Sequence, residues 1–134
     1  MSHTEESRKY LAVGAIISGI GVALGAFGAH GLKTRVDAAS MAVYQTGVQY
    51  QLVHGLALIA IASSRDIITA ARLKLIARLW TIGIILFCGS LYLLAVTGVK
   101  ILGAITPLGG VCFLTGWLIL ASSALKGARN IPPA

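Results

Sequence analysis

The sequence predicts an all-α integral membrane protein, a four-helix bundle with both termini in the cytoplasm. Of the 134 residues, 57% are hydrophobic and 11% are charged, whereas soluble domains average about 45–50% apolar and about 25% charged residues. Four long stretches lack Asp, Glu, Lys and Arg, and the basic residues outside them are unevenly distributed. Together these three observations predict a single membrane domain over residues 1–134.

Each of the four uncharged stretches is long enough to cross a bilayer as a helix. A helix rises about 1.5 Å per residue, so about 20 residues span the roughly 30 Å hydrocarbon core. The predicted spans cover approximately residues 11–30, 45–64, 78–98 and 103–125. Because the loops between them are short, successive helices are expected to be antiparallel neighbours.

The distribution of basic residues predicts the orientation. Eight of the 11 Lys and Arg residues lie in the N-terminal segment, the second loop and the C-terminal segment, whereas three lie in the other two loops. By the positive-inside rule, both termini are cytoplasmic. The net charge of +7 then has a topological cause, and no nucleic-acid partner is expected. Since no Arg- and Ser-rich, acid-poor leader is present, we expect a bacterial inner (cytoplasmic) membrane, with a mitochondrial inner membrane as the alternative.

The first span carries small residues at helical spacing. They form one narrow stripe, which we expect to pack closely against another helix, because close backbone approach supplies the contacts that hold membrane helices together. The span ends in "GAFGAHGLK", where we predict Gly31 as a left-handed cap and His30 in the last turn. The packing stripe consists of Gly14, Ser18, Gly21, Gly25 and Gly28.

Polar residues concentrate in the second span, "YQTGVQYQLVHGLALIAIAS". A helical wheel places Tyr50, Gln51 and His54 on one face, and Gln45 and Gln49 on the other. His54 lies near the middle of the predicted span, where an ionisable residue normally faces the bundle interior and is a candidate for function.

The sequence is compatible with three roles for His54. As a neutral side chain it would join helices by hydrogen bonds to Gln51, Tyr50, Ser18 or Ser90, which are worth about 0.6–2 kcal/mol in membranes. Alternatively, it would carry protons or bind a ligand. A metal site is not expected, because His30 lies at the outer interface and its depth differs from that of His54 by roughly 15 Å.

The second loop, "RDIITAARLKLIAR", has a basic amphipathic pattern. Ile68, Ala71 and Leu75 share one helical face, and the basic side chains lie mostly off that face. We expect an interfacial stretch that binds anionic lipid headgroups, although a partner protein could use the same surface. The basic residues are Arg65, Arg72, Lys74 and Arg78.

The third and fourth spans offer further packing positions, Gly83 and Ser90 among them. Thr106 and Pro107 resemble an N-cap followed by proline in the first turn, so the fourth helix is expected to start there. If it starts near Ile101 instead, Pro107 would kink it. Both cysteines lie inside spans, so no disulfide or metal site is expected.

Three motifs in order along the chain resemble the YgdD/YwdK family of small multipass bacterial inner-membrane proteins. They are "GAFGAHGLK", "YQTGVQYQLVHGLAL" and "LFCGSLYLLAVTGVKILGAITPLGGVCFLTGWLILA". The resemblance covers about residues 14–121 and implies four membrane spans without assigning a biochemical activity. The positions that match the motifs are Gly25, Gly28, His30, Tyr50, Gln51, His54, Gly89, Ser90, Tyr92, Pro107, Gly109, Gly110 and Trp117.

Two functions therefore remain open. The chain contains no nucleophile elbow, phosphate-binding loop or haem-attachment motif, so we expect no catalytic activity and no cofactor. The favoured function is a structural or accessory protein, as a homo-oligomer or as part of a larger membrane complex. The alternative is a small transporter or proton-linked protein that uses the polar face of the second span.

Overall fold

The computed structural model describes residues 2–64 and 67–128, and all regular structure in these ranges is helical. A π-helical segment, Gly28–Leu32, extends α1, a second, Ile84–Cys88, joins α3 to α4, and a 3₁₀-helical segment, Lys100–Ala104, precedes α5. The prediction of an all-α protein is confirmed. The α-helices are α1 (His3–Phe27), α2 (Ala38–Ser63), α3 (Ala70–Gly83), α4 (Gly89–Thr97) and α5 (Thr106–Ala128).

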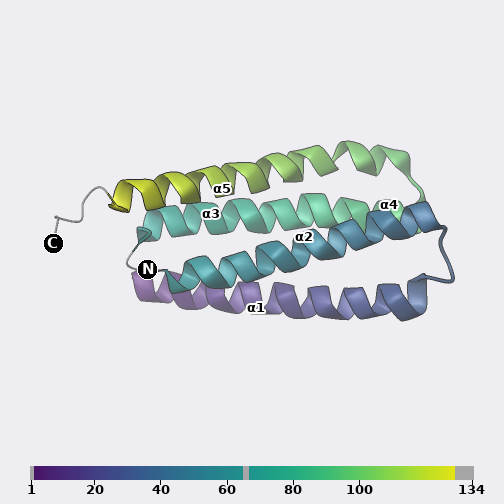
Figure 1. Cartoon of the computed structure of the whole chain (residues 1–134), viewed down its shortest axis with the longest axis horizontal. Helices are drawn as coiled ribbons and strands as arrows, with labels where there is room; N and C mark the ends of the chain where they lie inside the picture. Colours follow the sequence, from purple (N-terminus) through teal and green to yellow (C-terminus); the bar gives the residue numbers. More distant parts are fainter. Residues whose placement is uncertain (1, 65–66, 129–134) are drawn as a thin grey trace.

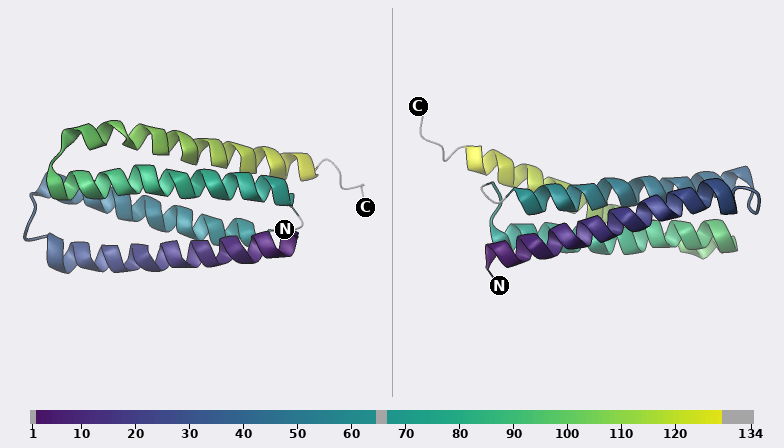
Figure 2. Two further views of the ribbon diagram at one scale, coloured as in Figure 1. Left: turned by 180° about the vertical axis from the view of Figure 1, so that it is seen from behind. Right: turned by 90° about the horizontal axis from the view of Figure 1, so that it is seen from below.

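The helices form long rods that lie side by side, with α3 and α4 in one continuous rod (Figures 1 and 2). α1 packs along α2, α3 packs along α5, and α2 also contacts α4. Because each rod reverses the direction of the one before it, the start of α1, the end of α2, the start of α3 and the end of α5 lie together. We call this the basic end, since it carries Arg8, Lys9, Arg72, Lys74 and Arg78; the opposite one is the far end.

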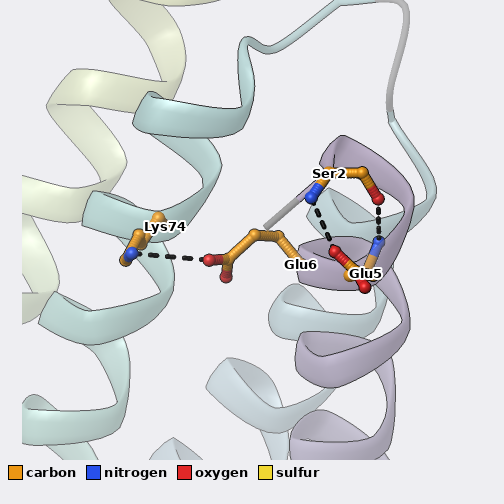
Figure 3. Close-up of polar contacts among 4 residues, drawn as sticks. All are labelled: Ser2, Glu5, Glu6 and Lys74. Carbon is orange, nitrogen blue, oxygen red and sulfur yellow. Dashed lines mark hydrogen bonds and ion pairs between the residues drawn. The ribbon is translucent and has the colours of Figure 1, made fainter.

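Short sequence motifs determine where the helices begin. Ser2 and Glu5 form a capping box at the start of α1: Glu5 N donates to Ser2 Oγ at 3.3 Å, and Ser2 N donates to Glu5 Oε2 at 2.7 Å (Figure 3). Asp37 caps α2 by accepting a hydrogen bond from Ser40 N at 2.7 Å. That hydrogen bond lowers the pKa of the exposed Asp37 carboxyl. Both polar caps lie at ends of the rods, where water is available.

The predicted left-handed cap at Gly31 is wrong. Among the described residues, the positive φ angle belongs to Gly98, which ends α4 with φ 71°. Gly31 continues the helix within Gly28–Leu32. Its missing side chain serves packing instead, because a Cβ at Gly31 would lie 2.8 Å from Phe27 Cε2. The helix therefore passes the glycine and ends at Leu32.

The predicted amphipathic face from Ile68 to Leu75 is also wrong. α3 begins at Ala70, because the Thr69 hydroxyl accepts a hydrogen bond from Arg72 N and caps the helix there. Ile68 consequently precedes the helix, and its side chain is buried in the core, whereas Leu75 is exposed. The two apolar residues therefore do not form one lipid-facing surface.

The fourth rod starts in two stages. The 3₁₀-helical segment Lys100–Ala104 comes first, and α5 then begins at Thr106. Pro107 lies in the first turn of α5, where its missing N–H removes no helical hydrogen bond. Ile101 therefore lies outside the α-helix.

Three rods in the described ranges are long and apolar enough to cross a membrane: His3–Leu32, Ala70–Thr97 and Lys100–Lys126. Large apolar side chains cover their outer surfaces, such as Ile16, Ile85 and Leu118, which are 62%, 66% and 71% exposed. α2 has 26 residues but is not among the three, because its glutamines and histidine lower its hydropathy. The fourth span therefore stays a prediction at this point.

The first prediction concerns the contact between α1 and α2. A Cβ at Gly14 would lie 2.8 Å from the Gly55 carbonyl oxygen, whereas nothing lies within 4 Å of one at Gly19. We expect Gly14→Ala to lower the free energy of unfolding in micelles by about 1–3 kcal/mol, because the backbones must separate. Gly19→Ala serves as the control and should leave stability unchanged or raise it by up to about 1 kcal/mol, since alanine favours helix. SDS titration measures both, and equal stability of the two variants would contradict the close contact.

Candidate functional site

The candidate site is the buried polar face of α2. Its main polar side chains, Tyr44, Gln51 and His54, are 2%, 5% and 3% exposed. They follow one another at helical spacing, and while Tyr44 and Gln51 contact α1 and Tyr92, His54 contacts α5. The sequence places them on a long helix in the centre of the fold, which contacts both α1 and α4.

Gln51 joins three rods through one amide. Its Nε2 donates a hydrogen bond to the Ile17 carbonyl oxygen of α1 at 3.0 Å. Its Oε1 accepts one from the Tyr92 hydroxyl of α4 at 2.8 Å. Since the amide donates on one side and accepts on the other, Gln51 is a bridge between α1 and α4.

Tyr44 provides a second link between α2 and α1. Its hydroxyl donates to the Leu24 carbonyl oxygen at 2.7 Å. Its ring packs against that of Tyr92, with centroids 5.1 Å apart. Tyr44 and Gln51 thus join α2 to α1 at two positions along the same interface.

Both ring nitrogens of His54 have hydrogen-bond partners. Nδ1 lies 2.8 Å from the Tyr50 carbonyl oxygen, and Nε2 lies 3.1 Å from Trp117 Nε1 of α5. A carbonyl only accepts and an indole N–H only donates, so Nδ1 carries the proton and Nε2 presents its lone pair. The surroundings therefore select the neutral imidazole with its proton on Nδ1.

Aromatic rings enclose the imidazole of His54. The Phe113 ring stacks on it with centroids 3.6 Å apart and an interplanar angle of 13°. Trp80 and Trp117 contact it edge-on, each with a centroid distance of 5.9 Å. His54 does not line the cavities beside Ser7, between Tyr10 and Arg78, beside Gln49 or beside Lys33. His54 is thus packed rather than open to a ligand.

The other predicted polar candidates lie apart from this cluster. Tyr50 contributes its backbone carbonyl to His54, while its side chain is 40% exposed and stacks on Phe87. His30 is exposed near the far end, in Gly28–Leu32. Ser18 is not a partner of His54, since its buried hydroxyl has no hydrogen-bond partner. Over the residues that the structure describes, no group of three or more His, Cys, Asp or Glu residues could hold a metal ion.

The packing stripe of α1 lies against α2. Gly14 faces Gly55, Gly21 faces Leu52, and Gly28 faces the Tyr44 ring. Ser18 and Gly25 complete this contact, since Ser18 lies against Gly55 and Gly25 against Val48.

The predicted packing residues of the third span contact α5. The Phe113 ring covers Gly83, and the hydroxyls of Ser90 and Thr106 share a hydrogen bond of 2.7 Å. Both residues therefore lie on the surface between the rod of α3 and α4 and the rod of α5.

Four residues of this site were not singled out as its members from the sequence: Trp80, Tyr92, Phe113 and Trp117. Trp80 is fully buried, and its indole N–H donates to the Phe113 carbonyl oxygen at 3.3 Å. The two tryptophans could have indicated a buried polar site, because an indole N–H within an apolar span needs a hydrogen-bond acceptor.

The basic end contains an ion pair within the protein. Glu6 is 3% exposed, and its Oε1 lies 3.4 Å from Lys74 Nζ, so it joins α1 to α3 (Figure 3). Arg72 Nη1 donates to Ser123 Oγ of α5 at 2.7 Å. Two of the predicted headgroup-binding residues therefore have partners in the chain. Arg78 is exposed, and Arg65 lies outside the described residues.

Comparison with known proteins places the chain among membrane proteins. A family model described as a protein of unknown function (DUF423) matches residues 24–110. The UPF0382 membrane protein YwdK of Bacillus subtilis is 43% identical over 118 residues, which cover 87% of this chain and 96% of that protein. The UPF0382 inner membrane protein YgdD of Escherichia coli is 38% identical over 123 residues, covering 91% and 94%. No solved structure matches the chain.

These comparisons bear on two expectations from the sequence. The resemblance to the YgdD/YwdK family is confirmed, since both named proteins match over most of the chain. The expected bacterial inner-membrane location is confirmed by the names of these relatives together with the apolar rods.

The second prediction tests the bridge at Gln51. Tyr92→Phe removes the hydroxyl that donates to Gln51 Oε1 and leaves a buried carbonyl oxygen unpaired. We expect the free energy of unfolding in micelles to fall by about 0.6–2 kcal/mol. Tyr50→Phe is the matched control, because the described hydrogen bonds include none from the Tyr50 hydroxyl. A Tyr92→Phe variant as stable as Tyr50→Phe would show that the bridge contributes nothing.

Proposed function

The chain belongs to the DUF423 family, and we propose that it is a non-catalytic structural or accessory component of a membrane assembly. In this proposal the rods form a four-helix membrane bundle, with α2 as the fourth span and both termini in the cytoplasm. The polar face of α2 serves to hold the helices together. No cofactor, metal or substrate is part of the proposal.

The environment of His54 is the observation that carries this proposal. A proton carrier must exchange protons with water or with a neighbouring titratable group. The imidazole of His54 instead has both nitrogens engaged and lies between aromatic rings. Protonation of Nε2 would place two N–H groups against each other at Trp117. These contacts favour an interhelical role over the alternative of a transporter or proton-linked protein.

The directions of the polar side chains support α2 as a membrane span. At about 1.5 Å per residue, its 26 residues extend about 39 Å, more than the hydrocarbon thickness. Tyr44, Gln51 and His54 point inward and are hydrogen-bonded. The apolar Val53 and Leu56 lie on its exposed side. A helix of this kind is compatible with lipid despite its polar composition.

The basic end supports a cytoplasmic location for both termini by the positive-inside rule. It also supports contact with anionic lipid headgroups. Arg78 and Lys9 border a cavity of about 250 Å³ between α1 and α3, whose walls include Val13 and Ile82. Arg78 is the principal headgroup contact in this proposal, because Arg72 and Lys74 also have partners within the chain.

The third prediction concerns the protonation of His54. Between about pH 5 and 8, where an unperturbed histidine changes charge, we expect His54 to stay neutral with its proton on Nδ1. Nitrogen-15 NMR of the imidazole group in micelles reports its protonation state at each pH. Titration of His54 in this range, in the folded protein, would contradict the structural role.

A flux measurement separates the structural function from transport. In liposomes we expect the same proton flux from the wild-type protein and from His54→Gln, because His54 carries no protons in this proposal. The variant is expected to fold, since a glutamine amide also donates and accepts hydrogen bonds. Thermal unfolding of the same samples establishes that the variant is folded. A flux present in the wild-type protein and absent from folded His54→Gln would overturn the proposal.

A further inference from the structure

α2 also carries two polar side chains on its outer face, those of Gln45 and Gln49. Gln45 and Gln49 are both exposed and lie one turn apart, so their amides stand one above the other. Val53, which is 48% exposed, and Leu56, which is 59% exposed, continue the same face toward the basic end. The two glutamines therefore belong to an outer face that becomes apolar beyond them.

Gln49 lies inside the hydrocarbon core if α2 is a span. Measured along the helix from its cap at Asp37, Gln45 lies about 12 Å and Gln49 about 18 Å from the far end. The predicted span begins at Gln45, so Gln49 lies about 6 Å inside the far edge of the core, while Gln45 lies at that edge and borders a cavity with Lys33 and Asp37. The Gln49 amide is therefore surrounded by hydrocarbon.

The amides of Gln45 and Gln49 are unpaired, in contrast to that of Gln51. The hydrogen bonds described for residues 2–64 and 67–128 include two from the Gln51 side chain and none from Gln45 or Gln49. Each amide has two N–H donors and a carbonyl acceptor, and leaving such groups unpaired in hydrocarbon costs several kcal/mol. An acyl chain offers neither donor nor acceptor. A protein surface must therefore supply the partners.

A groove lies beside the glutamines. Gln45 and Gln49 line a groove of about 320 Å³ between α1 and α2. Gly25 and Ala29 form its α1 wall, and Val48 and Leu52 lie on its α2 side. Because the α1 residues are small, another helix can approach closely, as in membrane helix pairs.

We propose that this groove, with Gln45 and Gln49, is the contact surface between two copies of this chain. The inference rests on the proposed function, in that it requires α2 to span the membrane, and it names the partner in the assembly. Two copies inserted in the same direction place their Gln49 amides at the same depth. A primary amide both donates and accepts, so the face is complementary to itself across a two-fold axis along the membrane normal.

Energy transfer between labelled copies in liposomes tests the pairing. We expect wild-type protein to form dimers, and Gln45→Leu/Gln49→Leu to dissociate on the order of tenfold more readily, since interhelical hydrogen bonds are worth about 0.6–2 kcal/mol. Thr46→Val is the matched control on the same helix, because the Thr46 hydroxyl bonds within α2. Monomeric wild-type protein, or equal dimerisation of the double variant, would overturn the proposal.

Disulfide crosslinking provides a second test, in which Gln49 is replaced and Gln45 is kept. In a chain with Cys88→Ala and Cys112→Ala, Gln49→Cys should crosslink two copies under mild oxidation, whereas Leu114→Cys, on the exposed side of α5, should not. Equal crosslinking at both positions, or a stable complex in mild detergent with a different protein on this face, would overturn pairing between copies. Neither result affects the proton flux or the protonation of His54, so failure of the pairing can be distinguished from failure of the proposed function.

Discussion

Close contact between α1 and α2 is the constraint on which the rest of the structure depends. Where Gly14 faces Gly55, no side chain separates the two helices. Lipid is as apolar as the helix surfaces, so no hydrophobic effect draws membrane helices together, and dispersion between closely packed backbones takes its place. This proximity also brings the Ile17 carbonyl oxygen within 3.0 Å of the Gln51 amide. A larger residue at Gly14 would remove the hydrogen bond along with the contact.

The inner polar side chains of α2 have backbone carbonyl groups as partners, which every helix supplies. Tyr44 and Gln51 donate to backbone carbonyl oxygens of α1, and His54 faces one in its own helix. A helical carbonyl already accepts one backbone hydrogen bond and has a second lone pair available. A side-chain donor on α2 can therefore be satisfied by another helix without a matching polar side chain. This explains how α1 binds the polar face of α2 while its own contact surface consists of small residues.

Features that depend on averages over many residues could be predicted from the sequence. Contacts with a single residue far away in the chain could not. The all-α class followed from uncharged stretches of about 20 residues, in which single exceptions have little weight. A helical wheel showed the face on which His54 lies, but its partner Trp117 is 63 positions away, and no periodicity identifies such a neighbour. The prediction of a cap at Gly31 was wrong for a local reason. A glycine that ends a helix cannot be distinguished in the sequence from one that makes room for a side chain such as Phe27. Similarly, the amphipathic pattern at Ile68 did not reveal that Thr69 starts a new helix.

The composition of α2 has a consequence for how the protein enters a membrane. α2 differs from the three apolar rods because it carries glutamines and a histidine. In the proposed topology, the short segment between Leu32 and Ala38 allows α1 and α2 to insert as a hairpin. Within such a hairpin, the carbonyls of Leu24 and Ile17 already satisfy donors of Tyr44 and Gln51 before the later helices arrive. The remaining partners come from later helices: Tyr92 of α4 for Gln51 and Trp117 of α5 for His54. Of these contacts, the one between His54 and Trp117 joins the residues farthest apart in the sequence, and it connects the two halves of the protein.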